Sequence, residues 1–591
     1  MKIKSGLKIA VSILFISGGF FILPSLALAD SLGDQNTFFV DSTYDVSGRT
    51  QVAATMRAIG ENAYFYLEDD YYQKLNGTYK NAIREELETL ADEFDNVVYP
   101  KLRTVYGSEW NPGIDQDSRI TILFTELVND AGGYFNAYDE FSRSEISNSN
   151  EREMIYFNAL NVFNPKNKAL LAHEFQHLIT FYQKTVIHGL EDDIWLNEAR
   201  SEYAPTICGY NNYYPRSYLS DRVDTFLDYP TEPLAEWKNN ISDYGAINLF
   251  MHYLVDHYGQ GILTRMILSN KVGIESINFA LSSLGYSKTF ADVFADWSVA
   301  NYLNDCQIGQ GQYCYLNKNL TPQRLSVDYS ASYSGFPSLI VSRSSSVKDW
   351  SPRWYRFRQG GTTLTDKDAL KLEFDASADL SRSNFRVPYI ITDQNNNTTV
   401  HNLSLEGQRG TAYISDFNEL DKTVVLIPIN QNKDNKFTNS DPLSLFSFTA
   451  SSISDDSIPG ESDSAGDLPG PQVNYPEGSL LRAKGDYRVY IIKGNYRRWI
   501  QKAEIFNQYQ HFKWEDIIDV EPSVMNQYQD AWLIRADNDK KVYEVNGDGT
   551  KHWLNMTAEE FTISGRKWDM VYIVNSFERD SYSTGSNVMF K

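Results

Sequence analysis

Residues 173–177 read H-E-F-Q-H, a short stretch that predicts both a helix and the chemistry the helix carries. Two histidines four positions apart lie on one face of a helix, where their imidazole nitrogens can share one tetrahedral zinc ion. Glu174 lies one position along and can act on an activated water without binding the metal. Because the chain has 8 His and 77 acidic residues among 591, chance predicts at most ~0.014 such matches. We therefore predict His173 and His177 as zinc ligands and Glu174 as a catalytic residue.

A second stretch, residues 195–202 (W-L-N-E-A-R-S-E), can supply the remaining metal ligand. Catalytic zinc takes three protein ligands and keeps a fourth position for water, and two histidines with one glutamate form such a set. Glu198 completes this set. Glu202 lies one helical turn later on the same face and can accept the second ring N–H of a ligating histidine, which fixes the tautomer of that histidine.

Together these two segments resemble the gluzincin metallopeptidases, and most closely the hyicolysin-like family. Residues 119–125 (R-I-T-I-L-F-T), 132–136 (G-G-Y-F-N) and 244–246 (Y-G-A) support this choice within the gluzincins. The resemblance covers roughly residues 51–324. It implies an α+β, thermolysin-like metallopeptidase domain over that range.

The resemblance also implies roles for single residues. According to the resemblance, zinc is bound by His173, His177 and Glu198. Glu174 is the general base and later the general acid. Thermolysin-like relatives carry a similar N-E-x-x-S-[DE] segment whose last acid supports a zinc-binding histidine, and Glu202 occupies that position. The implied reaction is zinc-dependent hydrolysis of a peptide bond. A G-x-M-E-N segment of the kind that reads free amino termini is missing from the sequence, so an endopeptidase is favoured over an aminopeptidase.

Three weaker features belong to the same region. Tyr244 is the candidate donor to the oxyanion, because a Tyr or His fills that role in similar enzymes; the alternative is a core aromatic residue at the start of the next helix. Residues 136–138 (N-A-Y) are predicted to lie on an edge strand that pairs with substrate backbone. Residues 115–117 (D-Q-D) hint at calcium, although the further acids and the glycine of an EF-hand loop are missing.

Two other classes of function stay open. The same constellation can serve a zinc hydrolase that acts on another carbonyl substrate. Alternatively, the chain could be a surface adhesion protein with a vestigial metallopeptidase domain. The intact set of His173, Glu174, His177 and Glu198 argues against the vestigial interpretation, because loss of Glu174 is what that interpretation would require.

The first 29 residues have the pattern of a secretory signal peptide. Three lysines precede an apolar run over residues 9–26, and A-L-A follows at residues 27–29, which predicts cleavage after Ala29. The alternative is an uncleaved membrane anchor. No later segment approaches ~18 continuous apolar residues, so we expect no membrane span in the mature chain and a secreted, extracellular protein.

The net charge and the cysteine content bear on the expected partners and on disulfide formation. A formal charge of −23 argues against nucleic-acid binding, which needs a basic face; protein or peptide substrates are the expected partners. Of the three cysteines, Cys306 and Cys314 flank a short loop and can form a disulfide in an exported protein. Cys208 is expected to be a small buried hydrophobic residue.

The length of the chain predicts two to four domains. After an N-terminal segment at 30–50, residues 51–324 are mostly helical with some strands. Helices are predicted over 82–102, 168–183 and 246–258, and strands over 119–127 and 154–157. For the second helix, Asn164 is the predicted N-cap and Pro165 the first helical position. Short β-type runs between turn residues predict an all-β sandwich over 325–450. Residues 451–478 are rich in Ser, Asp, Gly and Pro and predict a linker.

Residues 479–591 contain two copies of one sequence unit. L-R-A at 481–483 recurs as I-R-A at 534–536, and Trp499 and Trp514 are matched by Trp553 and Trp568. The offset, which stays at 53 to 55 residues throughout, predicts two units, about 479–530 and 531–591, each a hairpin followed by a short helix. The repeated tryptophans are expected mostly to fill cores, with stacking on sugars as the alternative. From its place after a linker, we expect this module to bind a cell-surface or glycan ligand.

Overall fold

The computed structural model describes residues 29–589, apart from short gaps at residue 130 and residues 321–330, 337–338, 360–367, 418–421, 439, 459–474, 485–486, 510, 521, 526–527, 538, 547–548 and 565. The chain divides into two compact units, residues 1–458 and 459–591. The predicted signal peptide, apart from Ala29, lies outside the described residues, as does the central part of the linker predicted at 451–478.

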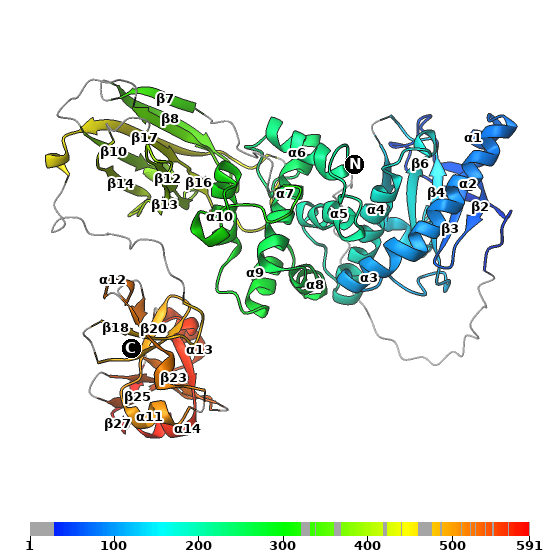
Figure 1. Cartoon of the computed structure of the whole chain (residues 1–591). Helices are drawn as coiled ribbons and strands as arrows, with labels where there is room; N and C mark the ends of the chain where they lie inside the picture. The colour runs from blue at the N-terminus through cyan, green and yellow to red at the C-terminus, as the bar shows by residue number, and fades with distance from the viewer. Residues whose placement is uncertain are drawn as a thin grey trace. The chain divides into compact units, whose positions relative to one another are not determined.

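The first unit begins with a mixed six-stranded sheet of order β1-β2-β3-β4-β6-β5 (Figure 1). Its strands are β1 (Gln35–Phe39), β2 (Gln51–Ile59), β3 (Ala63–Glu68), β4 (Ile120–Thr125), β5 (Gly133–Phe135) and β6 (Met154–Asn158). β3, β4 and β6 run parallel, whereas β5 pairs antiparallel with β6 at the edge. Because parallel neighbours need crossover connections, helices link β3 to β4.

Both faces of the central strands are buried. Successive side chains of a strand point to opposite faces, so in β3 Phe65 joins the apolar cluster formed with the helices, while Tyr64 joins a second cluster on the other face. Tyr134 of β5 stacks on Tyr156 of β6 with ring centroids 4.2 Å apart and helps to cover that second face. This double cover explains why every residue of β3, β4 and β6 is buried.

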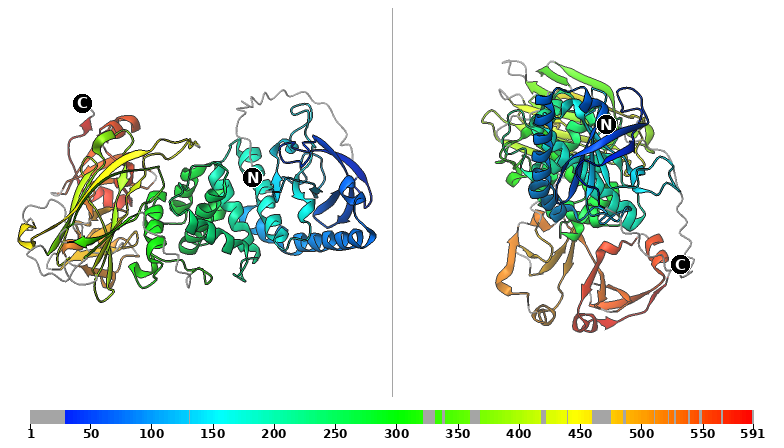
Figure 2. Two further views of the ribbon diagram at one scale, coloured as in Figure 1. Left: turned by 90° about the horizontal axis from the view of Figure 1, so that it is seen from above. Right: turned by 90° about the vertical axis from the view of Figure 1, so that its right-hand side faces the viewer.

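Helices make up most of the rest of the described residues from 29 to 303. They are α1 (Asp69–Gln73), α2 (Gly77–Glu93), α3 (Tyr99–Tyr106), α4 (Asn167–Thr180), α5 (Ile194–Cys208), α6 (Tyr218–Asp228), α7 (Ile241–Tyr258), α8 (Gly261–Leu268), α9 (Gly273–Ser283) and α10 (Phe290–Leu303). α2 runs along one face of the sheet (Figure 2) and contacts β2 and β3. α4 packs against α5, which in turn packs against α7.

Two predicted helices start earlier in the structure than the apolar pattern indicated. The helix predicted over 82–102 begins at Gly77, because the side chain of Asn76 accepts a hydrogen bond from the backbone N–H of Tyr79; it continues through a π-helical turn at Phe94–Val98 into α3. The helix predicted over 246–258 begins at Ile241, where a capping box starts it. Polar caps lie outside the apolar stripe, so periodicity alone placed both starts too late.

A β-sandwich follows α10 in the same unit. Its larger sheets have the orders β14-β10-β17-β8 and β13-β12-β15-β9-β7, and β11 and β16 form a third pair. The strands are β7 (Ala331–Phe336), β8 (Ile340–Val347), β9 (Tyr355–Gln359), β10 (Ala369–Asp375), β11 (Phe385–Arg386), β12 (Pro388–Thr392), β13 (Thr398–Asn402), β14 (Arg409–Ile414), β15 (Thr423–Leu426), β16 (Ile429–Asn430) and β17 (Ser444–Ile453). β17 runs three residues beyond the predicted end of the sandwich at Ala450.

The sandwich packs directly on the helices. The Trp350 ring lies 4.6 Å from that of Phe290 and 5.5 Å from that of Phe294, both on α10. Arg386 forms an ion pair with Asp292 at 2.8 Å. Apolar residues of the sandwich therefore belong to the same core cluster as the helices.

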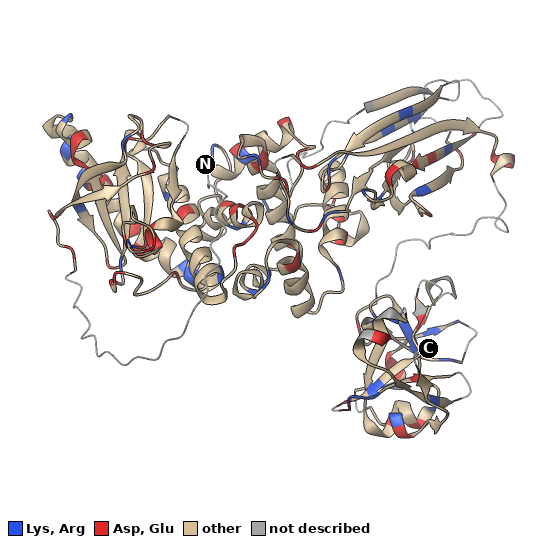
Figure 3. Cartoon of the chain, turned by 180° about the vertical axis from the view of Figure 1, so that it is seen from behind, with Lys and Arg blue, Asp and Glu red and all other residues tan. Residues whose placement is uncertain are grey.

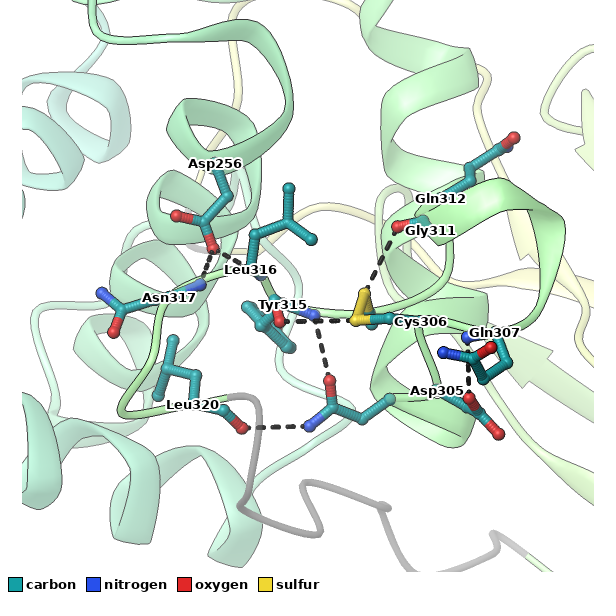
Figure 4. The surroundings of a disulfide bond; sticks show 12 residues. Asp256, Asp305, Cys306, Gln307, Gly311, Gln312, Tyr315, Leu316, Asn317 and Leu320 are labelled. Atoms are coloured by element: carbon teal, nitrogen blue, oxygen red, sulfur yellow. Dashed lines mark hydrogen bonds between the residues drawn. A yellow bond between two sulfur atoms is a disulfide. The ribbon is translucent and has the colours of Figure 1, made fainter.

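Cys306 and Cys314 form a disulfide that closes the loop after α10 (Figure 4). Just beyond this loop, the Asp256 side chain of α7 accepts hydrogen bonds from the backbone N–H groups of Leu316 and Asn317 at 2.9 and 2.8 Å. The crosslinked loop is thereby held against α7. Cys208, at the end of α5, is buried and carries a free thiol.

The second unit contains two similar small sheets, orange and red in Figure 2. Their orders are β21-β18-β19-β20-β22 and β26-β23-β24-β25-β27, with β28 also pairing with β25. The elements of the first repeat are β18 (Leu480–Ala483), β19 (Tyr490–Lys493), β20 (Tyr496–Trp499), α11 (Ala503–Asn507), β21 (Ile517–Val520), α12 (Pro522–Met525) and β22 (Gln529–Asp530). Those of the second are β23 (Leu533–Ala536), β24 (Val542–Val545), β25 (Thr550–Asn555), α13 (Ala558–Ile563), β26 (Val571–Val574), α14 (Ser576–Asp580), β27 (Ser583–Thr584) and β28 (Val588–Met589).

The expectation that the repeated tryptophans fill cores is wrong for one pair. Trp514 stacks on Phe506 with centroids 4.2 Å apart, and Trp568 stacks on Phe561 at 4.1 Å, yet the two tryptophans remain 53% and 50% exposed. Each ring covers a buried phenylalanine with one face only. Both repeats contain the Trp–Phe pair, but the sequence does not indicate which face of the tryptophan ring is exposed to solvent.

The described chain is a mixed α and β protein with several sheets; the thermolysin-like layout of its first part stays a prediction. Acidic and basic residues are interspersed along the ribbon (Figure 3). Among the described residues, no helix has the length and apolar character needed to cross a membrane.

Candidate metal centre

α4 carries both histidines and the intervening glutamate. Its first residue is Asn167, and Lys166 occupies the N-cap position without a side-chain bond. The prediction of Asn164 as N-cap is therefore wrong: Asn164 instead accepts the backbone N–H of Lys166 at 3.0 Å, in a turn that precedes the helix. The helix is anchored on its apolar side by Phe175, whose ring contacts that of Phe94 at 5.0 Å.

α5 brings its two glutamates against α4. Glu198 and Glu202, one turn apart on this helix, are both completely buried. Gly209 ends the helix in the left-handed conformation, with φ of 96°, which a residue without Cβ adopts at little cost. Gly209 thus marks the end of α5, and packing of α4 on α5 places Glu198 opposite the histidines.

The three candidate ligand atoms lie close enough together to hold one metal ion. His173 Nε2 and His177 Nε2 are 3.3 Å apart, and Glu198 Oε2 lies 3.5 Å from the first and 3.8 Å from the second. Tetrahedral bonds of about 2.0–2.2 Å require ligand atoms to be separated by about 3.3–3.6 Å. In the described part of the chain, this is the one group of His, Cys, Asp and Glu side chains whose three ligand atoms all lie within 4.8 Å of one another. The donors present therefore fit a metal ion.

The electrostatics of these groups are unusual for a protein interior. Burial lowers the pKa of His173 and of His177 to about 4, which keeps both imidazoles neutral, the form that binds metals. Burial raises the pKa of Glu198 to about 7, and burial followed by the Glu198 charge raises the pKa of Glu174 well above its usual range. Neither carboxylate has a hydrogen-bond partner among the described residues. Buried carboxylates without partners are costly, and a bound cation would offset that cost.

Glu202 lies behind His173 and has partners of its own. Its Oε1 is 3.5 Å from His173 Nδ1, too long for a strong hydrogen bond but suited to orienting the ring. Arg222 of α6 donates to both Glu202 oxygens, at 2.7 and 2.8 Å, and Tyr218 donates its hydroxyl at 2.7 Å. Asn248 of α7 adds a bond at 3.2 Å. Although burial would raise the pKa of Glu202, the nearby Arg222 lowers it, so Glu202 remains a carboxylate.

His177 is held by neighbours on its own helix and on α5. Its Nδ1 lies 3.3 Å from Asn197 Oδ1 and 3.2 Å from Ser201 Oγ. Ser201 donates its hydroxyl to Gln176 Oε1 at 2.5 Å. Because the Asn197 oxygen can only accept, it favours a proton on Nδ1 and leaves Nε2 free to bind a metal.

Tyr244 lies in the first turn of α7, not before the helix. Its ring packs edge-on against Trp237 at 5.1 Å, and the Arg222 guanidinium lies 4.8 Å from the ring centre. Its buried hydroxyl has no hydrogen-bond partner among the described residues. Burial raises the Tyr244 pKa well above its usual value, and the charges of Glu198 and Glu202 add to this effect.

The edge strand near the site differs from the prediction. Residues 136–138 do not form a strand: Asn136 caps a 3₁₀ turn at Ala137–Glu140. The edge strand is β5, at Gly133–Phe135. A Cβ added at Gly133 would lie 3.6 Å from Glu174 Oε1, and the Phe135 ring stacks near that of His177 at 6.4 Å. β5 thus borders the candidate metal centre.

Three residues of this site were missed by sequence reasoning: Arg222, Tyr218 and Asn248. Each contacts Glu202 from a helix that follows α5 in the chain. The local sequence around them has no motif. One signal was present, since a buried carboxylate requires a partner and Arg222 is on a helix whose other charged side chains are acidic.

Comparison with known proteins shows similarity to a metalloprotease. Over 252 residues the chain is 24% identical to the neutral metalloprotease ShpI of Staphylococcus hyicus, and the match covers 39% of this chain and 53% of that protein. The chain therefore spans about half the length of this relative. No family model matches the chain. Among solved structures, a family GH115 4-O-methyl-α-glucuronidase with specificity for decorated arabinogalactans is 8% identical to this chain. The match covers 57% of this chain and 52% of the glucuronidase, and its TM-score of 0.11 is too low to indicate a shared fold.

The similarity supports a metalloprotease family and, at this identity and coverage, no particular subfamily. It suggests a hydrolase with a metal cofactor. The cluster of His173, His177 and Glu198 could hold that metal.

Proposed function

We propose that the chain is a secreted zinc endopeptidase in which His173, His177 and Glu198 hold the metal and Glu174 transfers protons. One observation carries this proposal: three buried ligand atoms lie within 4.8 Å of one another, close to the spacing of tetrahedral zinc ligands, and Glu174 lies on the same helix as the two histidines. The similarity to a neutral metalloprotease points the same way.

The residues around the centre have distinct tasks in this mechanism. When bound, zinc supplies a Lewis acid that activates water and polarises the scissile carbonyl. Glu174, as a carboxylate, takes the proton from the attacking water and delivers it to the leaving nitrogen. Glu202 keeps the His173 ring in place. Tyr244 donates its unpartnered hydroxyl to the oxyanion as the negative charge develops.

The substrate backbone adds to the free edge of β5. An edge strand presents unpaired N–H and C=O groups, which an extended peptide can pair with. β5 ends the sheet and borders Glu174, so a peptide paired there would pass the metal centre. Lengthening a quenched peptide should therefore raise kcat/KM, and N-methylation of one paired amide should lower it.

Export is part of the proposal. It rests on the basic, apolar and small-residue pattern of residues 1–29. The Cys306–Cys314 disulfide is consistent with an oxidising compartment. Sequencing the N-terminus of the protein recovered from the culture medium should give Asp30 as the first residue; a protein retained in cells with residues 1–29 intact would contradict this.

The C-terminal repeats are proposed to bind a glycan or cell-surface polymer. The half-exposed rings of Trp514 and Trp568 support this, since sugars stack on such faces. The test is co-sedimentation of the full chain with insoluble cell-wall polysaccharide. Trp514→Ala with Trp568→Ala should abolish sedimentation, and equal sedimentation of the double variant would refute the role.

The ligand set is tested by one substitution with a matched control. Glu198→Gln removes a charged ligand with little change in size, and we expect it to weaken zinc binding by at least 100-fold and to abolish peptide hydrolysis. Glu191→Gln, on the exposed loop before α5, should behave as wild type. Unchanged zinc affinity in Glu198→Gln would show that the ligand set is wrong. Zinc bound tightly without any peptide hydrolysis in the wild type would instead indicate another carbonyl substrate.

A further inference from the structure

A second cluster of carboxyl groups lies on elements other than the two helices of the metal centre. Glu140 ends the 3₁₀ turn that follows β5, and Glu153 immediately precedes β6. Both side chains are 2% exposed. Asp115 belongs to the loop between α3 and β4. The chain thus brings acidic residues from three separate segments to one end of the six-stranded sheet.

Hydrogen bonds do not satisfy the two buried glutamates. Neither oxygen of Glu140 has a hydrogen-bond partner among the described residues, and Glu153 Oε2 has none either. Glu153 Oε1 accepts the backbone N–H of Ile114 at 2.8 Å. This approach depends on Gly113, because a Cβ there would lie 1.8 Å from Glu153 Oε2. The backbone at Gly113 and Ile114 therefore leaves room for the Glu153 carboxylate but donates a hydrogen bond to only one of its two oxygens.

The charges of the cluster are poorly compensated. Glu140 and Glu153 interact directly, and burial, then the Glu153 charge, raises the pKa of Glu140 well above its usual range. Burial raises the pKa of Glu153 to about 8 and that of Asp115 to about 6. Arg152 lowers the pKa of Asp115 but is itself bonded to Asp30. Two adjacent buried carboxylates require either a shared proton or a cation.

Neighbouring acids are already occupied and do not compete for that role. Asp139 accepts hydrogen bonds from Asn150 and from the Tyr156 hydroxyl, at 2.7–2.9 Å. Asp117 accepts the hydroxyl of Tyr64 at 2.7 Å. The buried oxygens without a hydrogen-bond partner in this cluster belong to Glu140 and Glu153, whose side chains interact with each other.

We propose that Glu140 and Glu153 are the central ligands of a divalent cation site of the calcium type, which Asp115 joins as a third ligand. Hard oxygen donors without nitrogen or sulfur suit Ca²⁺, which takes six to eight oxygens and accepts backbone carbonyls and water as the remainder. The three carboxylates do not yet lie within 4.8 Å as a set of three, a spacing that the described residues reach only around His173. Asp115, on a more exposed loop, therefore completes the site when the cation binds.

The cation would fasten two connections to the sheet. One is the loop before β4, which carries Asp115, and the other is the segment between β5 and β6, which carries Glu140 and begins directly after the edge strand beside the metal centre. The sequence hint of calcium at residues 115–117 shares Asp115 with the proposed site. The other two proposed ligands, Glu140 and Glu153, follow 25 and 38 positions later in the chain.

The test measures calcium binding by the full chain supplied with one equivalent of zinc, using CaCl₂ as the probe. Equilibrium dialysis gives the number of Ca²⁺ bound, and thermal unfolding gives Tm with and without CaCl₂. The variants are Glu140→Gln, Glu153→Gln and Asp115→Asn. Glu145→Gln is the matched control, because Glu145 is an exposed glutamate on the same segment.

We expect the wild type to bind one more Ca²⁺ than either Gln variant, and its Tm to rise by several degrees at saturating CaCl₂ while theirs stays unchanged. Without calcium, both Gln variants should unfold at or above the wild-type Tm, since they remove an uncompensated buried charge. Asp115→Asn should weaken binding about tenfold, and Glu145→Gln should match wild type. Equal stoichiometry in wild type and Gln variants, or a wild-type Tm indifferent to CaCl₂, would overturn the proposal. If both Gln variants fail to fold, calcium affinity unchanged in Asp115→Asn would overturn it as well.

Discussion

Replacing Arg222 with Met removes the cation that neutralises Glu202. The Arg222 Nε and Nη2 atoms donate to the two Glu202 oxygens at 2.7 and 2.8 Å; the Glu202 side chain is completely buried and that of Arg222 is 17% exposed. Met retains most of the apolar stem of arginine, so the change tests the charge more than the volume. Tyr218 and Asn248 remain as donors to Glu202.

The size of the effect follows from these contacts. Breaking a buried ion pair by removing one partner costs about 3–5 kcal/mol in unfolding free energy, because the remaining charge is left without compensation. Because Tyr218 and Asn248 still donate to Glu202, we expect the loss in unfolding free energy to lie near the lower end of this range, at about 3 kcal/mol. Glu202 would then hold His173 Nδ1, 3.5 Å away, less firmly. Loss of such a supporting partner lowers metal affinity by about 10–100-fold.

Two measurements on the variant check both parts. Urea unfolding followed by circular dichroism gives the loss in unfolding free energy, and competition with a zinc chelator gives the change in affinity. Arg84→Met is the control, because Arg84 forms an exposed ion pair with Glu88 at 3.8 Å and should change stability by less than about 0.5 kcal/mol. A loss below about 1 kcal/mol in Arg222→Met together with unchanged zinc affinity would refute the reasoning.

Three other changes have definite expected outcomes. Tyr244→Phe should keep zinc binding and KM but lower kcat by about 100-fold or more, because it removes one oxyanion donor; unchanged kcat on a quenched peptide would exclude that role. Trp350→Ala should cost about 3–5 kcal/mol in urea unfolding by emptying the contact with Phe290, and a loss under 1 kcal/mol would show that the sandwich is not packed as described. Burial would raise the pKa of Glu68, but hydrogen bonds from Arg49 bring it below its usual value of 4.5. Its stabilising effect is therefore present above pH 4.5 and lost as pH falls through the lower folded pKa; Glu68→Gln should flatten the stability–pH curve in that acid range, and an unchanged acid limb would contradict this.

The helix that carries the histidines could be predicted because its information is local. Spacing of four residues places His173 and His177 on one face of any helix, and the structure forms α4 there. The same holds for the turn from Glu198 to Glu202 on α5. That α4 and α5 meet with Glu198 at 3.5 Å from His173 depends on packing, for which the resemblance to known metallopeptidases was the only guide.

Features that depend on distant segments could not be predicted. Arg222 and Asn248 reach Glu202 across 20 and 46 positions of the chain, and no local motif links them. The same is true of Glu140 and Glu153, which lie together only because β5 and β6 pair. Helix starts were placed too late where polar caps such as Asn240 lie outside the apolar pattern.

The most direct test of the central claim compares the wild type with Glu174→Gln in zinc content and in hydrolysis of casein or a quenched peptide. Gln keeps the shape of the side chain but cannot take a proton, so the account predicts about one zinc per chain in both proteins, hydrolysis by the wild type, and a loss of at least about 10³-fold in kcat in the variant. Wild-type protein without zinc, or a Glu174→Gln variant as active as the wild type, would contradict it.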